Sequence, residues 1–212
     1  MPSYKLTYFD GRGLAEASRQ LFHLAGVAFE DERIPITAIS DGSWEQIKKD
    51  TPFGQVPVLS VDGFKIPQSG AIIRYLGRKF GFAGKTPEEE AWVDAIFDQF
   101  KDFNGAFRQV VLAQRAGKAA DEVDEIRQEE AIPARDTYFK ILDGLLEKSK
   151  SGWLVGDGVT FADLMVADNL TTLEKNDFLG GAEQPRLVAL REKVHSLEKL
   201  KHWIATRPDT QF

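Results

Sequence analysis

The chain has 212 residues, 42% of them hydrophobic, and a formal net charge of −6. This length allows one large or two modest domains with a real hydrophobic core, and the composition excludes a disordered chain. The acidic balance gives no reason to expect a nucleic-acid partner, and no stretch approaches the roughly 18 apolar residues of a transmembrane helix. Residues 1–20 carry early charges without an apolar run, so we expect no secretory signal, no membrane partner and a cytoplasmic location.

The first third of the chain alternates between strand and helix patterns. Tyr4–Tyr8 alternates like a strand, Leu14–Gly26 has the periodicity of an amphipathic helix that ends at a glycine, and Phe29–Ile34 resembles a second strand. The connection over residues 35–43 is a long loop. The pattern predicts a mixed α/β unit.

Residues 51–76, TPFGQVPVLSVDGFKIPQSGAIIRYL, are the most informative segment. Val58–Val61 and Phe64–Ile66 flank Asp-Gly, the strongest short hairpin signal. Ser69 stands where a helix N-cap is expected, and apolar residues follow at helical spacing. Pro57 can take a cis bond, which would turn the backbone of Val56 outward. A short peptide could then pair with Val56 while its anionic end faces the helix start.

The remainder of the chain is helical in period. Gly81 and Gly84 mark a boundary, and Thr-Pro-Glu-Glu-Glu begins a helix with a proline in the first turn and acids that suit the helix dipole. Two long helices are expected, over 87–115 and 121–148, with shorter ones after Thr160, Gln184 and Ser196. Thr160-x-x-Asp163 has the spacing of a capping box, to which we assign a structural role.

Residues 51–76, together with the opening MPSYKLTYFDGRGLAEASRQLF and the Thr160–Asp163 segment, make the chain resemble a cytosolic glutathione S-transferase, most similar to the sigma class and its nematode relatives. The resemblance covers essentially the whole chain. It implies a thioredoxin-like α/β domain over residues 1–80, a linker over 81–86, an all-α domain over 87–212, and a homodimer. The loop over 35–43 is longer than is usual in this family and is expected on the ligand side.

The chain has no cysteine, so it cannot form a disulfide, a CxxC redox pair or a thiolate of its own. Any sulfur chemistry must use a thiol that binds from outside, and glutathione meets that requirement as co-substrate. The three histidines have no metal-site or triad spacing, so no metal is expected. By resemblance, Tyr8 is the catalytic residue. A phenol hydroxyl aimed at the sulfur can supply the stabilisation that a thiolate needs near neutral pH.

The remaining site residues are implied by the resemblance, position by position. Glutathione contacts are expected at Tyr8, Trp44, Lys48, Gln55, Val56, Pro57, Gln68, Ser69 and, across the dimer, Asp102. The electrophile site is expected at Phe9, Gly11, Leu14, Asn104, Gln109, Met165, Asn169 and Phe212, with Gly11 leaving room beside Tyr8. Phe53 is expected to enter a pocket of the partner subunit. Arg12 either shares in the site or is structural, because the arginine that the family often carries two positions later is Leu14 here. The aromatic residues Phe97, Phe100, Phe103 and Phe107 fit a helix core.

The leading interpretation is a glutathione transferase that uses Tyr8 to stabilise the thiolate for attack on small apolar electrophiles. One alternative is a glutathione-dependent prostaglandin isomerase, which uses the same thiolate. Another is a non-catalytic carrier of haem or lipophilic ligands, or a structural protein. Retention of Tyr8 and of the whole peptide-binding edge argues against a purely structural protein.

Overall fold

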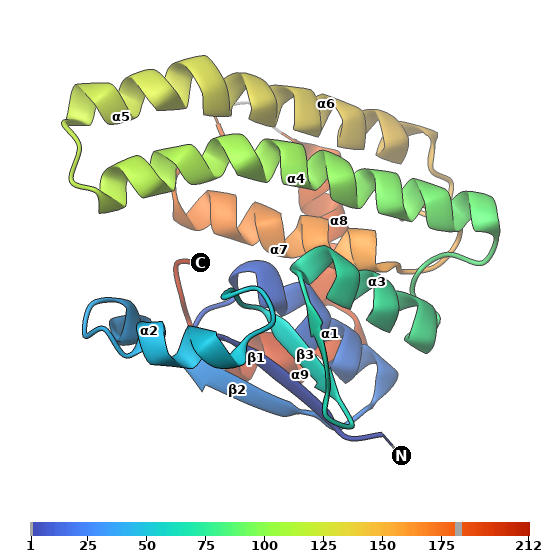
Figure 1. The fold of residues 1–212 in the computed structure, drawn as a ribbon. Helices are drawn as coiled ribbons and strands as arrows, with labels where there is room; N and C mark the ends of the chain where they lie inside the picture. Colours follow the sequence, from blue (N-terminus) through green and yellow to red (C-terminus); the bar gives the residue numbers. More distant parts are fainter. Residues whose placement is uncertain (1, 181–183) are drawn as a thin grey trace.

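The computed structural model describes residues 2–180 and 184–212. Its N-terminal part contains a four-stranded sheet in the order β2-β1-β3-β4 (Figure 1). The central strands pair in register, with Leu6 opposite Leu59 and both side chains fully buried. β1 is parallel to β2, whereas β3 is antiparallel to both β1 and β4. The strands are β1 (Tyr4–Phe9), β2 (Glu30–Ile34), β3 (Val58–Val61) and β4 (Phe64–Pro67).

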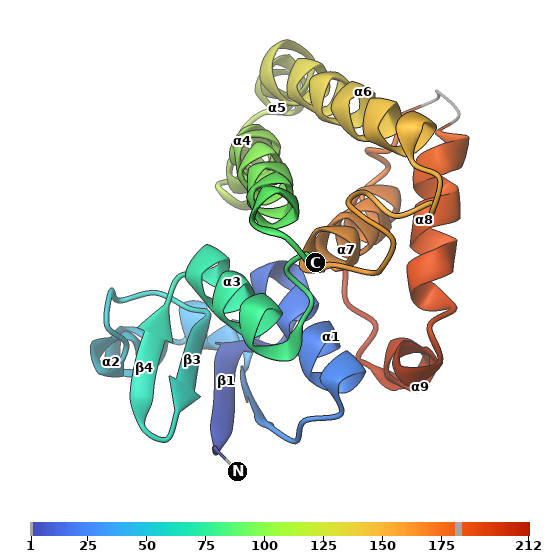
Figure 2. The ribbon, with the colours of Figure 1, turned by 90° about the vertical axis from the view of Figure 1, so that its right-hand side faces the viewer.

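Two helices join this sheet to the helical part of the molecule. α1 (Glu16–Ala25) follows a short 3₁₀ turn and ends at Gly26, which adopts a left-handed conformation with φ of 66°. α3 (Ser69–Phe80) packs against α1, and α1 in turn contacts α7 (Phe161–Lys175). Figure 2 shows α1 and α3 between the sheet and helices α4 and α7. This arrangement places the end of β1 under the helical part.

Two local expectations for this region need correction. Ser69 is the first residue of α3 and not its cap, because Gln68, with φ of 72°, turns the chain directly from β4 into the helix. The 35–43 connection contains a 3₁₀ turn, Ile36–Ile39, and is followed by the short helix α2 (Trp44–Ile47). The positive φ of Gln68 is a backbone conformation that residues other than glycine rarely adopt.

The helical part contains one long helix and several shorter ones. α4 (Pro87–Arg115) begins as predicted, with the Thr86 hydroxyl accepting a hydrogen bond from the Glu89 amide at 3.2 Å. The helix expected over 121–148 is interrupted: α5 (Ala120–Ile126) passes through a π-helical turn into α6 (Ile132–Lys148). Pro133 explains the interruption, because it has no amide hydrogen for the carbonyl one turn earlier. Two further helices complete the described residues, α8 (Pro185–His195) and α9 (Glu198–Thr206).

α7 runs through the centre of the helical part and is buried along most of its length. Asp163 holds its first turn, accepting hydrogen bonds from the Thr160 amide at 2.7 Å and from the Leu154 amide at 2.9 Å. Beside α7, the rings of Phe103 and Tyr138 stack with their centroids 5.1 Å apart. Among the residues that the structure describes, no helix combines the length and apolar character that crossing a bilayer would require.

Candidate functional site

Two cavities meet at the end of β1. A smaller one, of about 200 Å³, lies between the sheet domain and α4 and α7, and a larger one, of about 1030 Å³, extends over the sheet edge. Tyr8 and Leu14 contribute to the walls of both cavities, as do Arg108, Arg115 and Phe212. A ligand that fills the larger cavity would therefore touch a ligand in the smaller one beside Tyr8.

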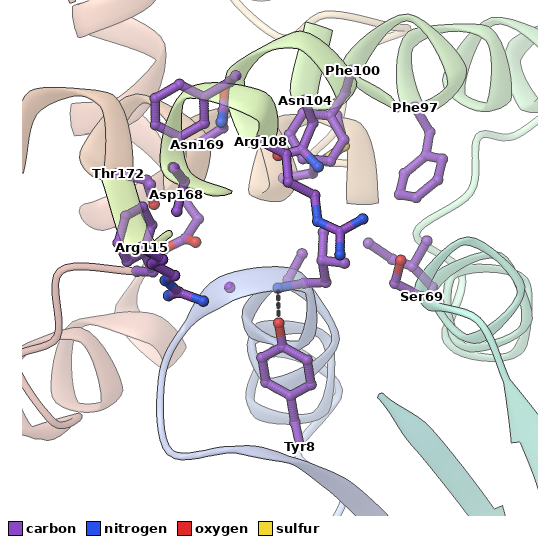
Figure 3. A pocket seen from close by; sticks show the side chains of 18 residues that line it. Tyr8, Ser69, Phe97, Phe100, Asn104, Arg108, Arg115, Asp168, Asn169 and Thr172 are labelled. Carbon is purple, nitrogen blue, oxygen red and sulfur yellow. Dashed lines mark hydrogen bonds between the residues drawn. The ribbon is translucent and has the colours of Figure 1, made fainter. Parts of the chain in front are cut away.

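The hydroxyl of Tyr8 is held by the chain segment that follows β1. The Leu14 amide donates a hydrogen bond to the Tyr8 oxygen at 3.3 Å, which Figure 3 shows as a dashed line. Because this oxygen accepts a bond from the backbone, its own proton remains available to a ligand. Burial raises the pKa of Tyr8, against the opposing effects of the Leu14 amide and of nearby arginine charges, so the phenol is protonated at neutral pH.

Gly13 makes the close approach of this segment possible. A Cβ at position 13 would lie 2.7 Å from the Tyr8 oxygen, and the glycine has φ of 41°. Both features require glycine here. Gly11, in contrast, does not border the Tyr8 ring as expected: a Cβ there would lie 3.0 Å from the carbonyl oxygen of Phe212. The space that Gly11 leaves is occupied by the C-terminal segment.

The larger cavity contains much of the predicted peptide-binding edge. The Val56–Pro57 peptide bond is cis, and within the described residues the amide and carbonyl of Val56 form no backbone hydrogen bond. Gln68 donates a side-chain hydrogen bond to Gln55 at 3.2 Å, and both residues line the cavity with Val56 and Trp44. Ser69, at the start of α3, lines the smaller cavity. The unpaired backbone and the free amides of the α3 terminus can hold an extended peptide with an anionic end.

Several predicted contacts lie outside both cavities. The ammonium of Lys48 forms an ion pair with Glu45 at 2.6 Å, and Pro57 is buried behind the edge. Asp102 is exposed on α4 and Phe53 is 62% exposed, as residues that contact a second subunit would be in a single chain. Gln109 is exposed on α4 and borders neither cavity. The expected place of Gln109 in the electrophile site has no support from this geometry.

The smaller cavity has largely apolar walls. Phe97, Phe100 and Phe107 are buried as expected, yet they also line this cavity. The predicted residues Asn104, Met165 and Asn169 border it too, whereas Phe9 and Gly11 border the larger one. The side-chain amide oxygen of Asn169, Oδ1, is buried and has no hydrogen-bond partner in the described residues.

Sequence reasoning missed several residues of the smaller cavity, among them Arg108, Val111, Arg115 and Thr172. The signal for the α4 residues was helical periodicity. Positions 97, 100, 104, 108, 111 and 115 recur every three or four residues and share one face, whereas position 109 is turned about 100° from Arg108. Extending the face that contains Phe97 and Asn104 would have identified both arginines and rejected Gln109.

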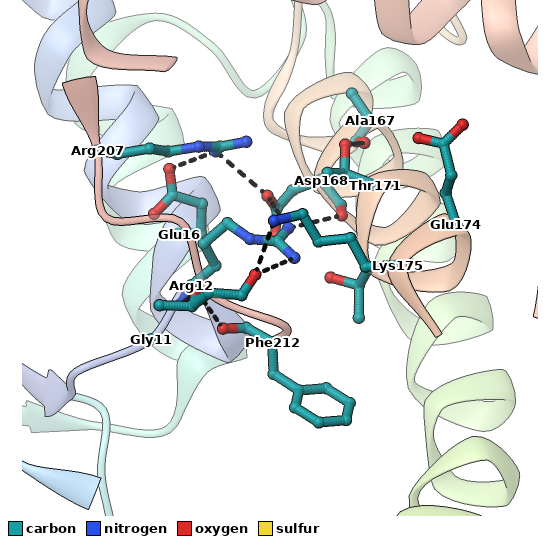
Figure 4. Close-up of polar contacts among 12 residues, drawn as sticks. Gly11, Arg12, Glu16, Ala167, Asp168, Thr171, Glu174, Lys175, Arg207 and Phe212 are labelled. Atoms are coloured by element: carbon teal, nitrogen blue, oxygen red, sulfur yellow. Dashed lines mark hydrogen bonds and ion pairs between the residues drawn. The ribbon is translucent and has the colours of Figure 1, made fainter. Parts of the chain in front are cut away.

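Arg12 has a structural role in a buried network of charges. It forms an ion pair with Asp168 at 2.8 Å, and Arg207 bridges Asp168 at 3.3 Å and Glu16 at 2.7 Å. The backbone amide of Arg12 also donates to the carbonyl of Phe212 at 2.8 Å. Figure 4 shows these side chains converging beside the C-terminal residue. The network thereby fixes Phe212 where it lines both cavities.

The structure joins an α/β domain with an unpaired backbone edge to helices that form an apolar cavity above a tyrosine hydroxyl, an arrangement that suits a transferase acting on two small substrates. Comparison with known proteins gives the family. The model of the glutathione S-transferase N-terminal domain matches residues 4–78, and that of the glutathione S-transferase C-terminal domain matches residues 101–207. The chain therefore belongs to the glutathione S-transferase family, which confirms the expected enzyme class, its fold and its co-substrate, glutathione.

Individual relatives match over nearly the full length. Glutathione S-transferase 3 of Caenorhabditis elegans is 50% identical over 212 residues, covering 100% of both chains. The structure of a Nu-class glutathione S-transferase from Haemonchus contortus is 46% identical with a TM-score of 0.86, covering 100% of both chains. The structure of a monomeric glutathione S-transferase from the hookworm Necator americanus is 45% identical with a TM-score of 0.85, covering 99% of this chain and 100% of its own.

Proposed function

We propose that this protein conjugates glutathione to apolar electrophiles and that Tyr8 stabilises the glutathione thiolate. The observation that carries the proposal is the Tyr8 hydroxyl, which lies where the two cavities meet and accepts the Leu14 amide at 3.3 Å. A tripeptide in the larger cavity would bring its sulfur to this hydroxyl. The apolar electrophile would occupy the smaller cavity on the other side of the sulfur.

The expected binding mode uses the peptide-binding edge. The cysteinyl unit would pair with the backbone of Val56, and the γ-glutamyl carboxylate would meet Gln68 and the α3 amides near Ser69. The glycine carboxylate would lie near Trp44 and Gln55. Lys48 would join it by exchanging its pair with Glu45 for the ligand, an exchange between exposed charges that costs little.

The required energy is within reach of one hydrogen bond. A free thiol has a pKa of about 8.5, and lowering it by two units needs about 2.7 kcal/mol of preference for the thiolate. A hydrogen bond to a charged group contributes about 1.5–3 kcal/mol. With 1-chloro-2,4-dinitrobenzene, the sulfur lone pair forms a C–S bond, chloride leaves with its bonding electrons, and the thiol proton passes to solvent. The gain in rate comes from ionisation and from the shared orientation of the reactants.

The test compares Tyr8→Phe with Tyr75→Phe, a control that removes a phenol hydroxyl from α3 without touching either cavity. The absorbance of the bound thiolate is titrated against pH, and kcat/KM is measured with 1-chloro-2,4-dinitrobenzene. We expect Tyr8→Phe to raise the thiol pKa by one to two units, of the order that the lost hydrogen bond supplies, and Tyr75→Phe to match wild type. Equal thiol pKa values in wild type and Tyr8→Phe would refute the mechanism.

The same comparison separates the alternatives. A carrier of haem or lipophilic ligands would be retained on immobilised glutathione without conjugating any electrophile. A prostaglandin isomerase would act on the prostaglandin precursor and lose that activity in Tyr8→Phe. The Tyr8 hydroxyl at the junction of the two cavities favours catalysis over a carrier role.

The homodimer, the sigma-class assignment and the cytoplasmic location belong to the same proposal. The 62% exposure of Phe53 supports the dimer, because burying one phenylalanine contributes roughly 1.5–3 kcal/mol. The monomeric hookworm relative speaks against a dimer, and the Nu-class relative speaks against the sigma-class assignment. The division into domains 1–80 and 87–212 with a linker over 81–86 also remains part of the proposal; the two family models match 4–78 and 101–207, one within each proposed domain.

Sedimentation of Phe53→Ser tests the dimer. We expect the variant to dissociate at a protein concentration at least tenfold higher than wild type. Phe64→Ser, which removes a ring that is 74% exposed at the β3–β4 turn, serves as the control and should sediment as wild type. A wild-type chain that sediments as a monomer would remove both the dimer and the role of Asp102 in the partner's site.

A further inference from the structure

Two arginines of α4 reach the place where the electrophile would lie. Arg108 and Arg115 are seven residues apart, so they share one face of the helix across two turns. Both line the smaller and the larger cavity. Figure 3 shows both side chains extending from α4 toward the space above Tyr8. The sequence pattern assigns them no role, and the thiolate mechanism only places their positive charges near Tyr8, where they oppose the rise of its pKa.

These arginines differ from the others near the site in having no carboxylate partner. Within residues 2–180 and 184–212, neither Arg108 nor Arg115 forms an ion pair or a side-chain hydrogen bond, whereas Arg12 and Arg207 both pair with Asp168. Asp168 lines the same cavity, and those two partners already compensate its charge. A chain with a net charge of −6 thus presents at this cavity two positive charges that pair with no carboxylate side chain of the described residues.

The two charges stand at the edge of an apolar space. The rings of Phe97, Phe100 and Phe107 line the smaller cavity with Met165. Arg115 lies over the Phe212 ring, 5.6 Å from its centroid, and this contact holds the guanidinium at the cavity mouth. Apolar walls with a planar guanidinium group at one end match a molecule that has an apolar body and one carboxylate.

We propose that the preferred electrophiles are amphipathic, with an apolar body in the smaller cavity and a carboxylate held by Arg108 and Arg115. This inference rests on the proposed transferase function and names the substrate class of the same site. In the proposed binding mode the carboxylates of glutathione would lie on the peptide-binding edge, near Gln68 and Gln55, which leaves the arginines to the second substrate. Both side chains are exposed, so the interaction selects among substrates more than it adds affinity.

The test uses one reactive group with and without a negative charge: ethacrynic acid and its methyl ester. In both, the thiolate adds to the terminal alkene carbon and a solvent proton completes the adjacent carbon, so no group leaves. We expect wild type to prefer the acid. Arg108→Gln and Arg115→Gln should each reduce kcat/KM for the acid about three- to fivefold, and the double variant about tenfold, mainly through KM.

Controls separate charge at the cavity from charge in general. The readout is the ratio of kcat/KM for the acid to kcat/KM for the ester, so that any general effect of a variant on the thiolate cancels. Lys140→Gln, which removes one exposed charge from α6 outside both cavities, should leave the acid-to-ester ratio unchanged. Added salt should lower the rate with the acid and spare the ester. An acid-to-ester ratio that is equal in wild type and the double variant would overturn the proposal.

A binding measurement decides the proposal independently of catalysis. Fluorescence titration compares 8-anilinonaphthalene-1-sulfonate, which is anionic, with the neutral N-phenyl-1-naphthylamine. The double variant should weaken binding of the anionic probe about tenfold and leave the neutral probe unchanged; equal weakening of both, or of neither, would refute it. If wild type conjugates neither ethacrynate nor 1-chloro-2,4-dinitrobenzene, the transferase function fails, and the probe comparison still decides whether the arginines bind anions.

Discussion

Replacement of Gly13 by alanine tests whether the segment after β1 positions the catalytic hydroxyl. A Cβ at this position would lie 2.7 Å from the Tyr8 oxygen and 2.9 Å from a ring carbon, where ordinary contact begins at 3.4 Å. The phenol or the segment must therefore shift by about 0.7 Å. A misplacement of about 1 Å can reduce a rate by about 10²-fold. We expect Gly13→Ala to lower kcat/KM about ten- to hundredfold.

Gly26→Ala is the matched control, because it imposes the same kind of backbone strain without a clash. Gly26 has φ of 66° and nothing within 4 Å of its would-be Cβ, whereas Gly13 has φ of 41°. An alanine in the left-handed region costs roughly 1–2 kcal/mol, so both variants should lose a few degrees of thermal stability. Only Gly13→Ala should lose activity, measured as kcat/KM and as the pKa of the bound thiol. Equal activity in the two variants would refute the positioning role of Gly13.

Two predictions concern ionisable residues of the helical part, Asp168 and His195. Asp168→Asn should destabilise the fold by about 3–5 kcal/mol in urea unfolding, because it removes a buried carboxylate that pairs with Arg12 and Arg207. Asp157→Asn, in an exposed pair with Lys85, should leave the stability close to that of wild type. Similar losses in the two variants would contradict this reasoning. Burial and neighbouring arginine charges lower the pKa of His195 from 6.5 to about 4. The stability that neutral His195 contributes is therefore present above about pH 6.5 and lost as the pH falls toward 4, by about 1–2 kcal/mol for this partly exposed ring. His195→Gln should remove this part of the acid dependence, and parallel stability–pH curves for variant and wild type would refute the assignment.

Local sequence signals predicted most of the N-terminal domain. The Asp-Gly turn between two strand-like runs located the β3–β4 hairpin to within one residue of its observed end at Pro67. The proline-led start of α4 and the left-handed end of α1 at Gly26 also followed from residue types alone. These features depend on backbone preferences that act over a few residues, so they are readable without a tertiary structure.

Other local expectations were wrong where a neighbouring residue changed the backbone. Ser69 has the chemistry of a cap, yet the φ of 72° at Gln68 starts the helix at Ser69, one residue earlier than that interpretation required. Pro133 replaced one long helix by two helices and a π-helical turn. Gln109 was assigned to the electrophile site by resemblance, but the helical phase of α4 directs it away from both cavities.

The sequence alone determined that any thiol used in catalysis must come from a bound ligand, because the chain has no cysteine. A chain without cysteine, which carries a tyrosine at the end of its first strand and a proline-marked peptide edge, needs an external thiol, and those residue identities are local facts. The tertiary structure decided which side chains share a space. Arg108 and Arg115 come to the Tyr8 cavity because α4 packs across the sheet domain, and Phe212 lies there because Arg12 and Arg207 tie the last residues to α1 and α7. Contacts between segments as far apart as residues 12 and 168 depend on the packing of whole helices, and no local preference encodes them.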